Sequence, residues 1–136
     1  MRAERWEPVS GIDGPIDHID FSYTSAGEAT VSITFTGSGG SARTLILRFR
    51  HVVVLACEDE APGGFIAAPA AQSLPKLERG RNSSWPFPLL RLLESQPLSQ
   101  YQMMRPQQLA HFYLVSLHNL VHVIASVGVE ASWLTS

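Results

Sequence analysis

Alternating apolar and polar residues predict three short strands in the first third of the chain. Every second side chain is apolar from His18 to Thr24, from Ala29 to Thr36 and from about Ala42 to Arg50. A period of two is typical of a strand with one face toward a core and the other toward water. Short turns at 25–28 and 37–41 join these segments, so we expect an antiparallel meander.

The longest run of apolar and β-forming residues lies near the C-terminus, from Leu109 to Leu134. Its β-branched and aromatic residues favour strands over a helix. Asn119 tolerates the positive φ of a tight turn, so we predict a hairpin that turns at His118-Asn119 and forms the inner strands of a sheet. The alternative is one helix over 107–127, which the many β-branched residues disfavour.

This turn decides which hairpin residues face each other, and it pairs Val115 with His122 and Tyr113 with Ile124. One face is apolar except for one serine, and we expect it to face the core: Phe112, Leu114, Ser116, Val121, Val123, Ala125 and Val127. The other face is mixed: His111, Tyr113, Val115, Leu117, Leu120, His122 and Ile124. The mixed face needs cover from a helix, a loop or a second chain.

A helix is predicted near 85–95. Residues 82–84 offer capping side chains, Pro86 suits a first turn, and Pro97 would end the helix. The apolar stripe would be Leu89, Leu90, Leu92 and Leu93. Residues 96–108 would then be extended or irregular.

These elements together predict a single domain over residues 1–136 of the α+β class. We expect a mainly antiparallel sheet of five or six strands, built from the meander and the C-terminal hairpin, with the helix covering one face. Breakers in 1–17 predict an irregular lead-in, and the Ala, Pro and Gly content of 58–82 predicts a mobile loop.

The composition limits the kinds of partner that we expect the protein to bind. The net charge is −2 and no basic block is present, so a nucleic-acid partner has no electrostatic support. Cys57 is the only cysteine, which leaves no disulfide and no zinc-binding cysteine cluster. The first residues lack the apolar core of a signal peptide, and no apolar stretch is long enough for a membrane helix. We therefore expect a cytoplasmic protein with no membrane partner.

Histidines supply the main candidate chemistry. His118 and His122 are four residues apart, but a hairpin would separate their rings and no HExxH motif is present, so we expect no metal and no cofactor. His111 and His122 share the mixed face with Tyr113 and could form an acid–base site. No carboxylate is placed by the sequence to orient either ring, so polar residues under a helix or in an interface are the favoured interpretation.

Three functions remain open. The first is a small non-catalytic domain of bacterial type that binds another protein or itself, with a homodimer as one form. Its candidate contact residues are Lys76, Arg79, Arg81 and Trp85, because basic and aromatic residues are common in binding hot spots. The second is a small-molecule binder with a pocket between helix and sheet, lined by Tyr101, Met103, His111, Tyr113 and His122. The third is an enzyme that uses His111 or His122.

Overall fold

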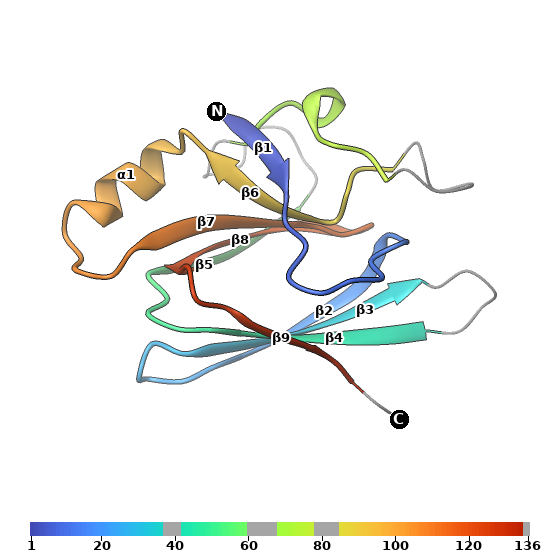
Figure 1. The fold of residues 1–136 in the computed structure, drawn as a ribbon, viewed down its shortest axis with the longest axis horizontal. Coiled ribbons are helices and arrows are strands. Elements are labelled where there is room, and N and C mark those ends of the chain that lie inside the picture. The colour runs from blue at the N-terminus through green and yellow to red at the C-terminus, as the bar shows by residue number, and fades with distance from the viewer. Residues whose placement is uncertain (37–41, 60–67, 78–84, 135–136) are drawn as a thin grey trace.

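The computed structural model describes residues 1–36, 42–59, 68–77 and 85–134, and its strands form two antiparallel sheets packed face to face (Figure 1). Sheet A has the order β1 (Arg2–Arg5), β6 (Leu89–Leu93), β7 (Leu109–Val115), β8 (Asn119–Ser126) and β5 (Val54–Asp59). Sheet B has the order β2 (Ile16–Tyr23), β3 (Ala29–Thr36), β4 (Ala42–Phe49) and β9 (Glu130–Trp133). The predicted α+β class with antiparallel pairing is confirmed, but the expectation of one sheet is wrong.

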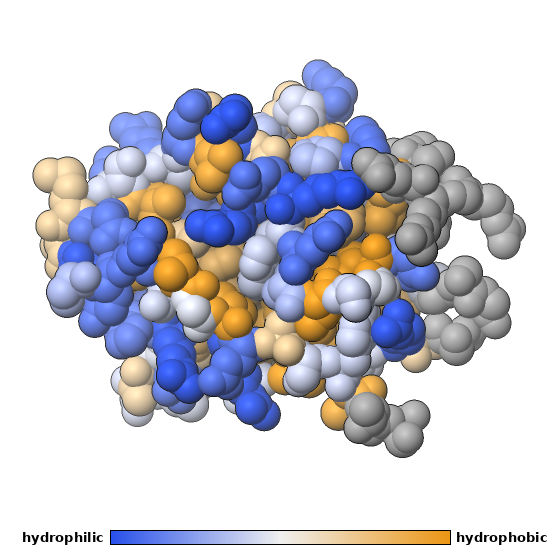
Figure 2. Space-filling view, viewed as in Figure 1, coloured by the Kyte–Doolittle hydropathy of each residue, from blue (hydrophilic) through white to orange (hydrophobic). Residues whose placement is uncertain are grey.

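The core lies between the two sheets, where their apolar faces meet. Phe49 of β4 and Phe112 of β7 pack with ring centroids 5.3 Å apart, and the Trp6 ring lies 4.5 Å from Phe112. Strands that are apolar on one face need a second layer to bury that face, and here a second sheet supplies it. Figure 2 shows apolar side chains reaching the surface mostly along the seam between the sheets.

The C-terminal hairpin is present, and the residues of its two strands lie on the faces expected of them. Val127 is the exception, because β8 ends at Ser126 and Val127 is 40% exposed instead of facing the core. Its turn, however, is one residue earlier than predicted. The Ser116 hydroxyl accepts from the backbone N–H groups of His118 and Asn119, so the turn residues are Leu117 and His118. Pairing shifts by two residues, and Tyr113 now faces His122. A shift of two keeps every side chain on its predicted face.

The helix predicted near 85–95 is wrong. Leu89–Leu93 form strand β6, which pairs with β1 on one side and β7 on the other. The helix, α1, spans Gln96–Gln102, with Ser95 as its N-cap and Pro97 in its first turn. Pro97 therefore helps to begin a helix rather than ending one, because proline lacks only an N–H that the first turn leaves unused.

Two other segments differ from expectation. The lead-in is not irregular throughout, since β1 pairs with β6. In the segment expected to be a mobile loop, Glu58 and Asp59 end β5, and Ala71–Ser73 form a 3-10 turn. Residues 60–67 and 78–84 lie outside the described part of the chain.

The chain itself covers the mixed face of the hairpin. In Figure 1, α1 and the 71–77 segment lie on the side of sheet A that faces away from sheet B. Beneath them His111, His122 and Ile124 are fully buried. No helix in the described residues is long and apolar enough to span a membrane.

Candidate functional site: a buried chain of histidines

Two histidines on neighbouring strands meet beneath α1. His111 on β7 and His122 on β8 are each 0% exposed, and the His111 Nε2 lies 2.9 Å from the His122 Nδ1. Tyr113, directly opposite His122, stacks on its ring at 4.7 Å between centroids. Alternation places residues 111 and 113 on one face of β7, so the strand pairing itself brings the three rings together.

Ser95 extends the pair toward the helix. Its Oγ lies 2.7 Å from the His111 Nδ1, and it also accepts the backbone N–H of Leu98 at 3.2 Å. The side chain that caps α1 therefore also contacts the histidine pair. A buried hydroxyl with both roles satisfies an orphan helix donor and an imidazole nitrogen at once.

The hydrogen-bond donors and acceptors of Ser95, His111 and His122 fit well only if each residue donates to the next in that order. Because Ser95 Oγ already accepts from Leu98, its O–H is free to donate to His111 Nδ1. His111 must then carry its proton on Nε2 and donate to His122 Nδ1. His122 in turn carries its proton on Nε2. The reverse direction would leave the serine proton without a use and a bare imidazole lone pair pointing at a carboxylate.

The hydrogen-bonded series Ser95–His111–His122 ends near Glu58 on β5. Within the described part of the chain, the buried His122 Nε2 makes no hydrogen bond, and the Glu58 Oε2 lies 3.9 Å from it. That distance is too long for a hydrogen bond, so the interaction is electrostatic. An N–H pointing at a carboxylate is nevertheless favourable, which supports the direction deduced above.

Burial keeps both rings neutral. The pKa of His111 is lowered to about 4, chiefly by burial and secondarily by the neighbouring His122. Burial also lowers the pKa of His122, although the Glu58 carboxylate partly opposes this. A charged imidazolium would lose its hydration here, and for His122 the Glu58 carboxylate offsets only part of that loss.

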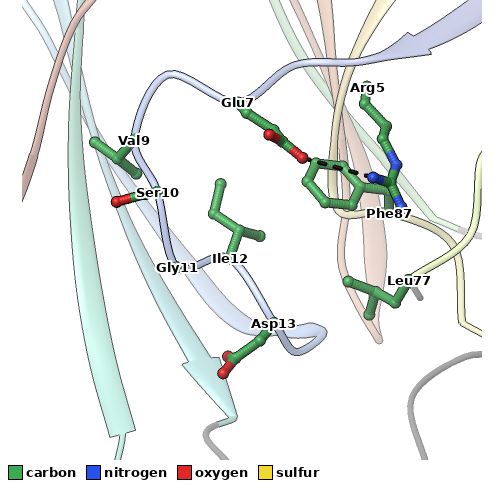
Figure 3. A pocket seen from close by; sticks show the side chains of 9 residues that line it. All are labelled: Arg5, Glu7, Val9, Ser10, Gly11, Ile12, Asp13, Leu77 and Phe87. Atoms are coloured by element: carbon green, nitrogen blue, oxygen red, sulfur yellow. Dashed lines mark ion pairs between the residues drawn. The ribbon is translucent and has the colours of Figure 1, made fainter. Parts of the chain in front are cut away.

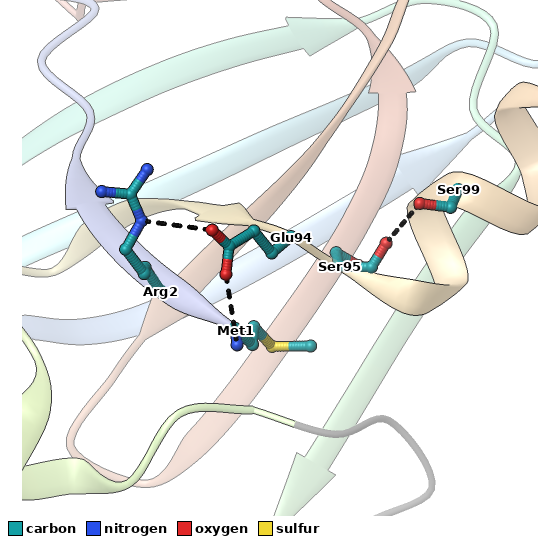
Figure 4. Close-up of polar contacts among 5 residues, drawn as sticks. All are labelled: Met1, Arg2, Glu94, Ser95 and Ser99. Carbon is teal, nitrogen blue, oxygen red and sulfur yellow. Dashed lines mark hydrogen bonds and ion pairs between the residues drawn. The ribbon is translucent and has the colours of Figure 1, made fainter.

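Further polar contacts lie around the N-cap of α1, and one of them reaches strand β1. Figure 4 shows the Ser99 hydroxyl bonded to the Ser95 carbonyl, at 3.2 Å. Glu94, just before the cap, has a φ of 61° and lies 3.8 Å from Arg2. A positive φ is uncommon for a residue with a side chain, so the backbone turns sharply here into the helix.

Of the five residues expected to line a pocket, the structure groups three: His111, Tyr113 and His122. Tyr101 is half-buried on α1, and Met103 is 88% exposed just beyond it. None of the five lines either of the two cavities described below.

The expected partner-binding residues are only partly described. Leu77, next to Lys76, bonds through its N–H to the Trp85 carbonyl at 2.9 Å, so Lys76 and Trp85 come from adjoining segments. The Lys76 ammonium donates to the Ala71 carbonyl, and Trp85 is exposed. Arg79 and Arg81 lie outside the described residues.

Sequence reasoning missed Ser95 and Glu58. Ser95 had a readable signal, because a serine two residues before a proline is typical of a helix N-cap. Glu58 had none, since only the pairing of β5 with β8 brings it near His122. Among the described residues, no group of three or more His, Cys, Asp or Glu side chains is placed to hold a metal ion.

A separate cavity of about 240 Å³ lies between the lead-in and the end of the 71–77 segment (Figure 3). Its apolar lining is Val9, Ile12, Leu77 and Phe87. Arg5 lies at one end, stacked over Phe87 and 3.7 Å from Glu7. No residue of this cavity was singled out from the sequence.

Strand β2 forms the other notable surface. It is an edge of sheet B, and within the described residues it pairs with a strand on one side only. Phe21 and Tyr23 lie on its core-side face, opposite Val31 and Ala29, yet they are 38% and 56% exposed. A cavity of about 370 Å³ lies between Tyr23 and the Val52–Leu55 segment.

Comparison with known proteins adds no relative. No family model, no curated protein and no solved structure matches this chain.

Proposed function

We propose that this chain is a non-catalytic cytoplasmic interaction domain that binds an extended segment of another protein along the free edge of β2. The observation that carries the proposal is the combination of an eight-residue edge strand, in which the hairpin turn occupies only the Ile16 end, with exposed Phe21 and Tyr23 at the other end. An unpaired edge offers a row of backbone donors and acceptors to an added strand. The other edge strands, β1, β5 and β9, are shorter.

The chemistry of β2 indicates the pattern of the partner. On one face, Ile19 and Phe21 alternate with Tyr23, and Tyr23 lines the cavity at Val52–Leu55. Elsewhere β2 carries Asp17 and Asp20, and neither β2 nor β3 contains a lysine or arginine. A complementary strand would alternate apolar residues with basic ones, since opposite charges across strands attract.

The histidine chain supports a non-catalytic role. Both rings are fully buried, so a substrate could not reach His111 or His122 without a rearrangement of the structure around them. Their depressed pKa values also leave them poor proton acceptors at neutral pH.

The proposal can be tested with a synthetic eight-residue peptide that alternates valine and lysine. We expect it to shift the backbone amide resonances of β2 and of Val52–Leu55, and a Val-Glu peptide of equal length to leave them unchanged. Phe21→Lys should abolish the shifts. Ser132→Lys, an equivalent change on the other edge strand of sheet B, should preserve them.

Shifts that map away from β2, or no shifts at millimolar peptide, would contradict this function. A second copy of the protein is the other molecule that could bind this edge, and sedimentation of the free protein tests for it. A dimer that Phe21→Lys converts to a monomer would mean that β2 binds a second copy instead.

A second candidate is small-molecule binding in the 240 Å³ cavity. The favouring observation is a cavity of mixed lining, in which apolar side chains adjoin the Arg5 guanidinium and the carboxylates of Glu7 and Asp13. The apolar side chains and Arg5 suit a compact ligand with one anionic group. Benzoate is a suitable probe: a rise in melting temperature that Arg5→Met removes would support this role, and no rise at 10 mM, on the order of the weakest useful affinity, would exclude it for that class.

A further inference from the structure

Helix α1 is held to sheet A by polar contacts at both ends. At its start, Ser95 joins Leu98 of the first turn to His111 of β7. At its end, the Gln102 side chain accepts from the Leu109 N–H and donates to the Gln107 carbonyl, each at 2.7 Å. The helix has seven residues and none is buried, so these contacts matter more than apolar packing.

The two attachments differ in how they respond to a proton. Gln102 does not titrate. A proton on His111 turns its Nδ1 from an acceptor into a donor, so the bond to Ser95 must reverse. The Ser95 Oγ would then receive N–H groups from both Leu98 and His111, and its own proton would lose its acceptor.

Few groups near the rings could compensate an added charge. Glu58 of β5 faces His122 at 3.9 Å, and Tyr113 of β7 stacks on it. Next to the Ser95 cap, the exposed Glu94 lies near Arg2, and Tyr101 is half-buried on α1. The strand neighbours Leu92 and Ile124, paired with His111, carry no charge. Among the described residues, the Glu58 carboxylate is therefore the one acidic group placed beside the two rings.

We infer that the Ser95–His111–His122 chain is a pH-operated latch: it holds α1 against sheet A while the rings are neutral and releases the start of the helix when His111 takes up a proton. Release exposes the Ser95 hydroxyl and the His111 ring, both of which are buried in the closed form. The latch is independent of strand addition at β2, which lies in the other sheet.

The direction of the response follows from the two states. The pKa of His111 is about 4 in the closed form and returns toward its ordinary value once the ring is exposed. The open form binds more protons between these values, so acid favours opening. From pH 7.5 to pH 5 the opening constant of α1 should rise about 30-fold, if the exposed ring titrates near 6.5.

Hydrogen exchange of the α1 amides, corrected for the intrinsic effect of pH, tests this directly. We expect the acid-dependent opening in the wild type and its loss in His111→Gln, whose amide keeps hydrogen bonds but takes no proton. Gln102→Ala should raise opening equally at both pH values. His18→Gln, at an exposed histidine, should change nothing.

An unchanged pH response in His111→Gln, or equal opening of the β3 and β4 amides, would overturn the latch. If His111→Gln does not fold, a titration of the wild-type protein still tests the latch. The His111 ring resonance and the Leu98 amide should titrate together below pH 5, and a His111 midpoint near 6.5 without a change at Leu98 would overturn the inference.

Discussion

The two faces of sheet A are equally buried, but different forces hold them. Toward sheet B, Phe112 packs against Trp6 and Phe49 in an apolar core. Toward α1, His111 and His122 are just as inaccessible and are joined by directional hydrogen bonds. Apolar packing depends on volume and is indifferent to pH, whereas a buried imidazole pair depends on its protonation. One strand, β7, thus carries a pH-independent face and a pH-dependent face.

The largest expected effect is on the apolar face. Phe112→Ala should lower the free energy of unfolding by about 3–5 kcal/mol, because it removes a ring that two other aromatic residues contact and leaves a cavity. Urea unfolding at pH 7.5 measures the loss, and Phe112→Leu, which keeps most of the volume, should cost much less. The difference between wild type and variant should stay constant from pH 5 to pH 8. A loss that changed with pH would break the distinction between the faces.

The second effect is the acid response of the whole protein. His111 binds a proton less readily when folded than when unfolded, so its stabilising contribution is complete above about pH 6.5 and is lost as pH falls toward 4. The total is about 3 kcal/mol, near 1.4 kcal/mol per pH unit within that window. Urea midpoints at closely spaced pH values measure it. A flat profile between pH 6.5 and pH 5 would mean that the rings are hydrated in solution.

Removing the His111 ring should lower the free energy of unfolding by somewhat less than full protonation does. His111→Ala leaves both Ser95 and His122 without a buried partner, and we expect about 2 kcal/mol of destabilisation at pH 7.5. At pH 4.5 the difference from wild type should shrink, because the wild type has by then lost most of this contribution. The double variant His111→Ala/His122→Ala should cost less than the sum of the two single changes. Strict additivity would show that the rings do not interact.

The faces of the hairpin could be predicted from the sequence because each strand has a period of two. Phe112, Leu114, Val121 and Val123 reach the core as expected. The register could not be predicted, since it depends on Ser116, whose hydroxyl organises the turn through contacts that no pattern of apolar residues reveals. The faces survived this error only because the shift was of two residues.

The segment from Leu89 to Leu93 shows the opposite case. Its leucines fit a helical stripe, but a strand that is covered on both faces also has no alternation. Whether it is covered depends on β1 and β7, which are far away in sequence. Likewise His111 and His122 could be assigned to one face, but Ser95 and Glu58 join them only through the tertiary fold.

The smallest effect concerns the link between helix and sheet. Ser95→Ala should cost about 1 kcal/mol at pH 7.5, because Leu98 loses its capping oxygen and His111 loses a donor. Ser95→Asp is the sharper variant. A carboxylate can still cap the helix, but it can only accept, so it forces the proton of His111 onto Nδ1 and favours the charged ring. The pKa of His111 should therefore rise above about 4, as a titration of its ring resonance would show, and α1 should stay closed to lower pH. If Ser95→Asp left the pKa of His111 unchanged, the serine would cap the helix without controlling the histidines, and the two faces of β7 would differ only in composition.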